Sequence, residues 1–529
     1  MMASILLAGS GCEGNFEPKI YGDLFSTNFP KTESDYESYF LIGYHALSAV
    51  WSYQVYDGDV SHRPFYAAEG GVMQCFDTTA DYMAPTRVNT RGGAWIEWTE
   101  GNYANAIYYG TNGSNINPMH FQKIRQVTRL TKILGTIRDA TILSEGKKTA
   151  FMAETRLLRG IIMYYLMHIY GPVPVIVDPD LVGNIEAEKN MARPSLEQMV
   201  EWIYDDFDYA RQYMPNTAPL GRYTADYARF FLMKHCLNEG FYDKAIEMYQ
   251  ELKSSEKNYG LFTEGANPYV EQFKPTRKFN KEVIMAISVG TSDADARNDA
   301  FTFGFYVVPS NASRYADAAN TIPTFYAPLA SSFGNWFNVS PVFYDTYESG
   351  DHRRDVVVTS YVLNDASRTV VTKDDLNSRW DGYIILKFPM LSEGPWYDFP
   401  LARWADVLLM YAEAVARTTN AVPTGEAMQG VNDVRARAGL APLSGQAVAN
   451  YNNFMDALLL ERGHEFLYEG FRKIDLIRFN KFRRTLREIK DVTPTHQYVP
   501  LPNYAVRAAE QDGIILEQVY ERPNYSSDN

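Results

Sequence analysis

The stretch ERGHEFLYEGFRKIDLIRF, which begins at Glu461, holds the densest group of residues that could do acid–base chemistry. Glu461, Glu465 and Glu469 recur every four residues, so a helix would place them on one face. They could form a catalytic carboxylate cluster or a structural ion network that locks helices together. Apolar residues fill the gaps between the charges, which favours the structural network. A glycosidase needs two carboxylates several ångströms apart, and nothing in the spacing singles out such a pair.

Other motifs with known chemistry are incomplete. The segment at His464 begins like a zinc-protease motif, but Tyr468 stands where the second His is required. The segment SEGKKT lacks the leading Gly of a phosphate loop, and the segment DADARND at Asp293 lacks the spacing and closing Glu of a calcium-binding EF-hand. A solvated loop is the favoured interpretation of DADARND. We therefore expect a protein that is not an enzyme and has no cofactor, with Ca²⁺ as an unsupported possibility.

Aromatic residues in two irregular segments are the candidates for ligand binding. The chain has 8 Trp, 38 Tyr and 29 Phe, and rings that lie among Gly, Asn and Ser without helical period are poor core candidates. Such rings can pack against the apolar face of a sugar. The alternative is that some of them only fix their loops. We predict a site between the two segments, formed by Trp95, Trp98 and Trp336, with Tyr306 and Tyr315 as weaker candidates.

Charge and cysteine content narrow the class of protein. The formal net charge is −14. Such an acidic chain is unsuited to binding nucleic acid, because phosphate contacts need clustered Lys and Arg. Three cysteines are too few for a disulfide framework. Cys75 and Cys236 either pair or are two buried free thiols.

Cys12 has a different setting. It follows ILLAGSG at the start of the chain, a short apolar run that ends in small residues. This arrangement is typical of a bacterial lipoprotein signal, in which the Cys becomes the lipidated first residue. We expect residues 1–12 to be that signal and residues 13–35 to be an extended leader. No Lys or Arg precedes the apolar run, and the alternative is a frayed terminus with an incidental Cys.

An apolar-rich stretch without Asp, Glu, Lys or Arg, between Arg159 and Asp178, has a length that suggests a membrane span. Gly171 and Pro172 divide it, because proline cannot continue a helix and glycine suits the position after a helix end. The helix should therefore end at Tyr170, too soon to cross a bilayer. We predict a buried core helix followed by a short extended segment.

Helical patterns predict a mainly α scaffold in one unit over residues 36–529. The helical parts are expected at about 36–56, 120–260 and 400–490, and the loop-rich excursions, with a few short strands, at about 57–118 and 260–400. Two helix pairs have the character of tetratricopeptide units. They are YTADYARFFLMKHCLNEGFYDKAIEMYQELKSS and RWADVLLMYAEAVARTT followed by AMQGVNDVRARAGL.

Several segments together resemble the SusD/RagB family of nutrient-binding outer-membrane lipoproteins. They occur in the order found in that family and cover most of the chain after about residue 120. The segments are AETRLLRGIIMYYLMHIYGPVPVI, GRYTADYARFFLMKHCLNEGFYDKAIEMYQEL, SPVFYDTYESGDHRRD, LARWADVLLMYAEA, VNDVRARAGLAPL, ERGHEFLYEGFRKIDLIRF and YVPLPNYAVRA.

The resemblance implies a binding protein without catalytic activity. Family members capture a nutrient, usually a glycan, at the cell surface and deliver it to a SusC-like TonB-dependent outer-membrane barrel. It also implies a lipid anchor at Cys12 in the outer membrane, and ligand-binding aromatic residues in the two loop-rich parts. Some members take up oligopeptides instead, so an oligopeptide receptor stays the alternative. A glycosidase or a pure interaction scaffold is less favoured.

Overall fold

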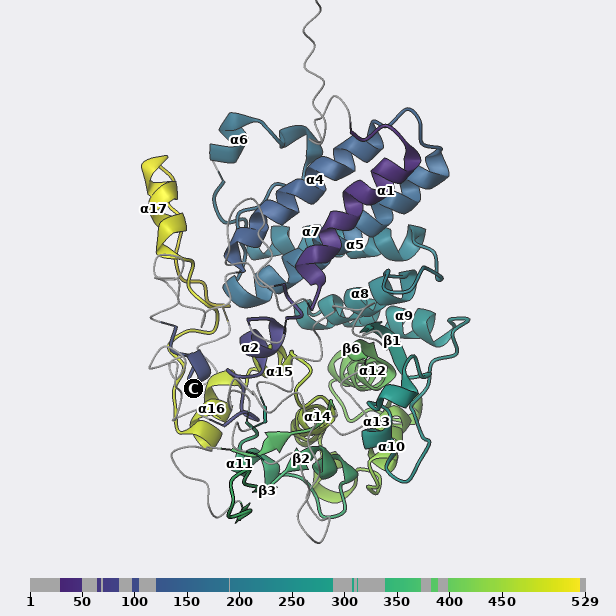
Figure 1. Ribbon diagram of the computed structural model, residues 1–529, viewed down its shortest axis with the longest axis vertical. Coiled ribbons are helices and arrows are strands. Elements are labelled where there is room, and N and C mark those ends of the chain that lie inside the picture. The colour runs from purple at the N-terminus through teal and green to yellow at the C-terminus, as the bar shows by residue number, and fades with distance from the viewer. Residues whose placement is uncertain are drawn as a thin grey trace, which may run out of the picture.

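The computed structural model describes residues 29–49, 64–67, 70–84, 98–103, 120–189, 191–288, 307–308, 312, 338–372, 382–388 and 398–523. These residues are mostly helical, with a few short strands, so the predicted mainly α fold class is confirmed (Figure 1). The helices are α1 (Glu33–Leu41), α2 (Val72–Phe76), α4 (Ile124–Arg138), α5 (Glu145–Tyr170), α6 (Ile185–Lys189), α7 (Leu196–Tyr213), α8 (Ala225–Glu239), α9 (Tyr242–Lys253), α10 (Pro268–Glu271), α11 (Pro341–Tyr344), α12 (Trp404–Thr419), α13 (Gly425–Arg437), α14 (Tyr451–Glu465), α15 (Arg472–Arg478), α16 (Phe482–Lys490) and α17 (Asn503–Gln511).

Short 3₁₀ helices and strands complete the described elements. The 3₁₀ helices are η1 (Ile42–Leu47), η3 (Phe121–Lys123), η4 (Pro179–Leu181), η5 (Pro275–Arg277), η8 (His352–Val356) and η10 (Gly445–Val448). The strands are β1 (Val283–Ile287), β2 (Val357–Val358), β3 (Tyr361–Val362), β4 (Val370–Val371), β5 (Ile384–Ile385) and β6 (Phe399–Arg403). They form three antiparallel pairs, β1 with β6, β2 with β5 and β3 with β4.

Helix α5 is the buried helix that the sequence predicts. The Ser144 side chain accepts a hydrogen bond from the Lys147 N–H at its start, and the helix ends at Tyr170, as expected. Gly171 has φ +74°, and a Cβ at this position would lie 2.3 Å from the Tyr520 ring, so only glycine fits. No helix among the described residues has the length and apolar character that a membrane crossing requires.

Charged residues enter the core around α5 only with partners. Arg159 donates two hydrogen bonds of 2.8 Å to the Asp206 carboxylate of α7, and its third guanidinium nitrogen bonds the Thr131 hydroxyl of α4 at 2.8 Å. A buried charge with no partner would cost several kcal/mol. These contacts therefore fix the packing of α4, α5 and α7.

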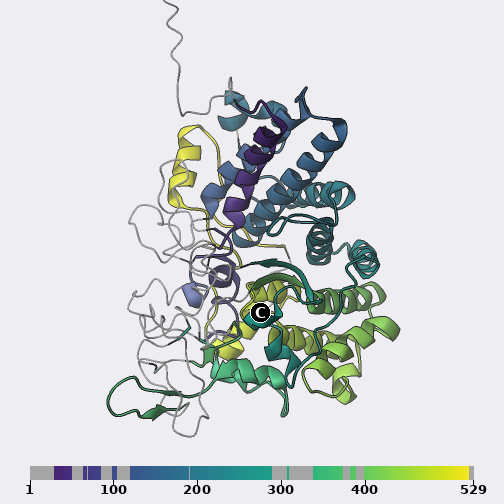
Figure 2. The same cartoon turned by 45° about the vertical axis from the view of Figure 1, so that its right-hand side comes forward.

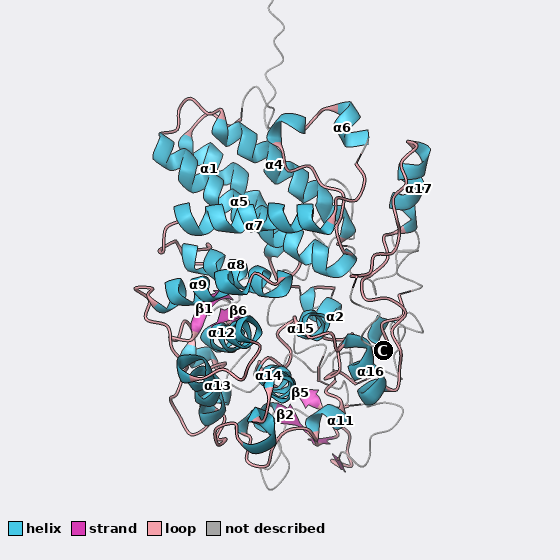
Figure 3. Cartoon of the chain, turned by 180° about the vertical axis from the view of Figure 1, so that it is seen from behind, coloured by secondary structure: helices cyan, strands magenta, loops and turns pink. Residues whose placement is uncertain are grey.

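The scaffold is a stack of helices in which each packs on the next. α5 packs on α4 and α7, α7 on α8, α8 on α9, α9 on α12, and α12 on α13 and α14 (Figures 1 and 3). The two predicted tetratricopeptide-like pairs are α8 with α9 and α12 with α13. The Ser195 side chain accepts from Gln198 N–H and begins α7, as the sequence indicates.

The structure corrects one local prediction and decides another that the sequence left open. The helical part predicted at about 36–56 is not one continuous α-helix, because α1 stops at Leu41 and the chain tightens into η1, while residues 50–56 lie outside the described residues. Cys75 and Cys236 are both buried free thiols, which settles the choice that the sequence left open.

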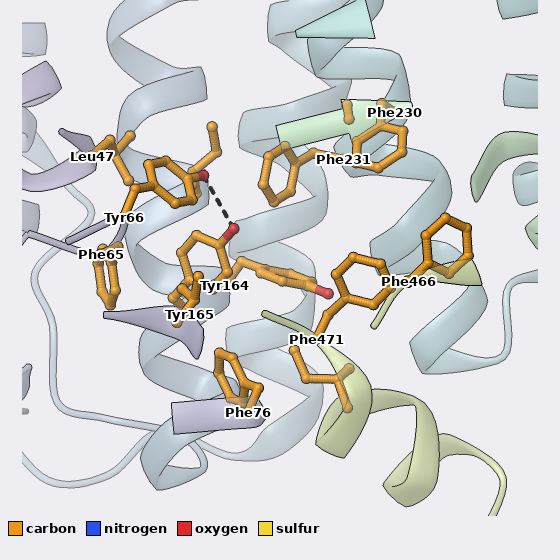
Figure 4. Close-up of a cluster of buried hydrophobic side chains, with 14 of the residues drawn as sticks. Leu47, Phe65, Tyr66, Phe76, Tyr164, Tyr165, Phe230, Phe231, Phe466 and Phe471 are labelled. Carbon is orange, nitrogen blue, oxygen red and sulfur yellow. Dashed lines mark hydrogen bonds between the residues drawn. The ribbon is translucent and has the colours of Figure 1, made fainter. Parts of the chain in front are cut away.

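The core is continuous from the first helices to the last and is rich in aromatic rings. Tyr66, Tyr165 and Phe231 lie together inside it, and the hydroxyls of Tyr66 and Tyr165 are 3.1 Å apart (Figure 4). Phe76 of α2 and Phe471 complete this cluster from segments nearly 400 residues apart in sequence. Many tyrosines are thus core residues, and the Tyr66 hydroxyl lies within hydrogen-bond distance of the hydroxyls of Tyr165 and Tyr227.

Candidate ligand-binding site

Trp98 is the predicted ligand-binding residue that lies in the described part of the chain. Its side chain is only 3% exposed, its indole N–H donates to the Gln74 carbonyl at 2.9 Å, and its ring packs edge-on against Tyr103. This position favours the alternative interpretation, in which the ring fixes its loop. The other predicted residues lie outside the described residues, as does the Asp293 segment: Trp95, Trp336, Tyr306, Tyr315 and Cys12.

The described ends of the two loop-rich excursions meet. Met83 of the first excursion bridges Val339 of the second, and Val339 also pairs with Tyr383. Ala84 N–H donates to the Asn338 carbonyl at 2.8 Å, and Ser340 N–H donates to the Tyr82 carbonyl at 2.9 Å. We call the segments 82–84, 338–340 and 382–383 the junction.

Close backbone contact at the junction requires Gly382. A Cβ there would lie 2.5 Å from the Val339 carbonyl oxygen and 2.8 Å from the Ala84 Cβ. Any side chain would push the three segments apart. No local pattern in the sequence predicts this contact, because the first and last of these segments lie about 300 residues apart in the chain.

The first excursion is fixed to the segment before α15. Asp77 is the C-cap residue of α2. Its carboxylate accepts from Gly470 N–H at 2.7 Å and from Arg472 N–H at 3.3 Å. The Arg472 guanidinium donates to both oxygens of Asp81 at 2.9 and 2.8 Å. Burial raises the pKa of Asp77 to about 7. Helices α2 and α15 accordingly lie side by side (Figures 1 and 3).

The second excursion is fixed by a set of buried charges that we call the buried ion network. Five buried carboxylates face five buried cations in it, and the exposed Glu348 also pairs with Arg435 at 2.8 Å. Its members are Glu282, Asp351, Glu461, Glu465 and Glu469 with Arg353, Lys387, Arg403, Arg435 and Arg437.

Members of the buried ion network stand where the second excursion begins and ends. Glu282 precedes β1, Arg403 ends β6, and their side chains are 2.6 Å apart. Lys387, next to the junction, donates to the carbonyls of Glu465 and Leu467 at 2.9 and 3.0 Å. The network therefore joins the excursion to α13 and α14.

Glu465 is the centre of the network. Burial disfavours its charged form, but the guanidinium groups of Arg437, Arg403 and Arg353 outweigh burial and lower the pKa of the carboxyl. Glu461 and Glu469 are also buried and paired. This is the structural ion network that the sequence favours over a catalytic cluster. The shared helical face is wrong for Glu469, because α14 ends at Glu465 and Tyr468 takes φ +63°.

Aromatic residues that the sequence analysis missed lie beside the junction. Tyr344 packs edge-on against Tyr383 with ring centroids 5.1 Å apart, and Tyr347 stacks on His464 at 3.9 Å. Tyr344 is half-buried, whereas Tyr347 and His464 are buried. Within the sequence, residues 341–347 stand out only through the family resemblance. The carboxylates of the buried ion network near these rings are occupied by structural pairs.

Comparisons with known proteins agree with this architecture. A family model described as the SusD family matches residues 323–512, and one described as starch-binding, associating with the outer membrane, matches residues 66–232. A SusD-like protein of Formosa agariphila is 21% identical over 421 residues, which are 73% of this chain and 75% of that protein.

Solved structures share the fold. A SusD superfamily protein from Bacteroides vulgatus aligns with a TM-score of 0.67 at 19% identity, over 90% of this chain and 97% of the other. A laminarin-binding SusD-like protein aligns with a TM-score of 0.65 at 19% identity, over 94% of this chain and 100% of the other. The helix stack, the two matched regions and the shared fold establish that this chain belongs to the SusD/RagB family.

Proposed function

We propose that this protein binds oligosaccharides at the cell surface and delivers them to a SusC-like TonB-dependent transporter of the outer membrane. The observation that carries the proposal is the junction, which brings the two loop-rich excursions to one place on a rigid helical support. The starch-binding description of one matching family model and the laminarin-binding relative support a glycan as ligand.

The chemistry expected of the site is stacking combined with hydrogen bonding. Trp95 and Trp336 belong to the two excursions that the junction joins, so they are our candidates for the stacking rings, with Tyr306 and Tyr315 as weaker candidates. Each aromatic contact contributes on the order of 1 kcal/mol. Support from the buried ion network limits the ordering cost of binding, because a pre-organised site loses less freedom.

The test of ligand class is calorimetry on Trp95→Ala and Trp336→Ala. We expect wild type to bind laminari- or malto-oligosaccharides and each variant to bind about 5-fold or more weakly, as the loss of roughly 1 kcal/mol implies. Trp202→Ala is the matched control, since Trp202 lies on α7 in the scaffold. Circular dichroism verifies folding. Wild type that binds oligopeptides and no oligosaccharide would make this an oligopeptide receptor and refute the proposal.

The proposed membrane anchor is a lipid on Cys12. Cys12→Ala should move the protein from the outer-membrane fraction to the soluble fraction. The experiment is done in cells that lack the barrel partner, so that binding to the transporter cannot retain the variant. Retention of Cys12→Ala in the membrane fraction of those cells would contradict the anchor.

A further inference from the structure

A polar hollow of about 510 Å³ opens beside the junction, formed by α11, η8 and the segment that follows η8. This volume lies in the usual range of small-ligand sites, roughly 300–1,000 Å³. Tyr344 forms one wall, and the same ring contacts Tyr383 of the junction at 5.1 Å. A ligand on the junction can therefore extend into the hollow without crossing the core.

The side chains that line the hollow have unused hydrogen-bonding capacity. The guanidinium of Arg354 lies over the Tyr344 ring, 4.7 Å from its centroid, and among the described residues no carboxylate pairs with it. The hydroxyls of Thr359 and Ser360 likewise make no hydrogen bond to any described residue. Groups of this kind are normally bonded to water at a surface, and a ligand that replaces the water gains their hydrogen bonds.

His352 borders the hollow with its ring against Gly439, where a Cβ would lie 2.8 Å from the ring Nε2. Its Nδ1 atom is shielded from solvent and has no hydrogen-bond partner within the described structure. The residue is held firmly, because its N–H donates to the Ala438 carbonyl at 2.9 Å and its carbonyl accepts from the Asn267 amide at 3.0 Å. A ligand in the open hollow does not reach this shielded atom, so His352 borders the hollow as a fixed ring and is not counted among its hydrogen-bonding groups.

The charges of the hollow select a neutral ligand. The hollow is lined by one cation, Arg354, and by Asp355, which forms no ion pair with any described residue. The Asp355 carboxylate accepts from the Asn267 amide at 2.8 Å. Asp351 is paired with Arg353. An anionic group would meet Asp355 as well as Arg354, whereas a hydroxyl can accept from the arginine and donate to the aspartate.

We propose that this hollow is a second subsite that binds a neutral sugar unit of an oligosaccharide whose other units lie at the junction. Hydroxyl groups of the sugar bond to Arg354, Asp355 and Ser360. The inference rests on the proposed glycan-binding function. It adds that the glycan is neutral and long enough to occupy both the junction and the hollow.

The experiment compares ligand lengths in two variants. Laminari-oligosaccharides of two to six units are titrated calorimetrically into wild type, Arg354→Gln and Ser360→Ala. We expect both variants to bind the hexasaccharide about 3- to 10-fold more weakly, the effect of losing one or two hydrogen bonds, while the shortest ligand that binds wild type keeps its affinity. Arg484→Gln, which removes an exposed arginine of α16 that pairs with Glu488, is the matched control.

A second measurement needs no variant. Hydrogen–deuterium exchange of wild type with the hexasaccharide should slow in residues 350–360, and the shortest ligand that binds should leave exchange there unchanged. Unchanged hexasaccharide affinity in both variants, or unchanged exchange in this segment, overturns the subsite while the proposed function stands. Tighter binding of oligogalacturonides that is lost in Arg354→Gln overturns the neutral class. Wild type that binds no oligosaccharide refutes the proposed function itself, and the subsite with it.

Discussion

Replacing Glu465 with Gln tests whether the buried ion network is structural. The Glu465 side chain has no exposed surface and contacts Arg403 at 3.0 Å and Arg353 at 3.6 Å, and it also pairs with Arg437. Gln keeps the size of the side chain but removes its charge. The buried part of the network then holds five cations against four carboxylates, and Arg403 and Arg437 each lose a buried partner.

The size of the effect follows from burial. Removing one partner of a buried ion pair costs about 3–5 kcal/mol. Unfolding gains roughly 2.1 cal/mol/K per residue, so for 529 residues that unfold as one unit each kcal/mol lowers Tm by about 1 °C. Glu465→Gln should therefore lower Tm by about 3–5 °C. Oligosaccharide affinity should stay within about 2-fold, since no part of Glu465 is exposed.

Differential scanning calorimetry at pH 7 measures the loss. Glu488→Gln is the control, because Glu488 is 60% exposed in its pair with Arg484 and an exposed pair contributes about 0–1 kcal/mol. The difference between wild type and Glu465→Gln should shrink as the pH falls below about 4.3, the unfolded pKa of Glu. Because the pKa of Glu465 is lower in the folded protein than in the unfolded chain, its carboxylate stabilises the folded protein above that pH. This stabilisation is lost when the pH falls far enough to protonate the folded carboxylate. A variant with wild-type Tm and no ligand binding would show that Glu465 is functional.

Three further predictions concern single positions. Burial raises the pKa of Asp77 to about 7. The protonated carboxyl therefore contributes its whole stabilisation of the folded protein below about pH 4, and this contribution is lost as the pH rises through 7. The Tm of Asp77→Asn relative to wild type should therefore rise between pH 5 and pH 8, and a constant difference in thermal shift assays would contradict this. Gly171→Ala should lower Tm by about 1–3 °C or more, because it adds backbone strain of about 1–3 kcal/mol and its Cβ would collide with the Tyr520 ring. The control is Gly146→Ala, which should raise Tm slightly, since its Cβ would meet no atom within 4 Å. Trp98→Ala should cost about 3–5 kcal/mol in chemical unfolding and leave the oligosaccharide affinity of the folded protein within about 2-fold; lost affinity at unchanged stability would restore Trp98 as a ligand residue.

Local signals predicted the scaffold well. The break at Gly171 and Pro172 located the end of α5, and Ser195 located the start of α7, because both depend on hydrogen bonds and dihedral angles within a few residues. The charges around Glu465 were also interpreted correctly as structural, since apolar neighbours imply burial. Such features require no knowledge of the rest of the chain.

Long-range features could not be predicted from the sequence. Trp98 lies among Gly and Asn, which suggests exposure, yet the Gln74 carbonyl and Tyr103 enclose its ring. Glu469 continues a four-residue spacing, but the helix ends before it and Lys387 and Arg403 pair with it from another part of the chain. The hollow at His352 and Arg354 likewise depends on how α11 and η8 fold back beside the junction.

The distant contacts that fix the junction determine when folding can finish. Asp77 bonds Gly470 across 393 residues, Lys490 donates to the Thr78 carbonyl across 412, and Val499 N–H bonds the Ile169 carbonyl. In Figure 2 the yellow segment that contains α17 reaches back to the blue helices of the first half. Contacts between residues so far apart form slowly, because the intervening chain must first be ordered. During synthesis the early helices α4 to α9 can pair with one another, but the first excursion has no lasting position until residues 470–499 have been made. The nascent chain therefore exposes apolar surface late, and chaperones that delay collapse should raise its yield.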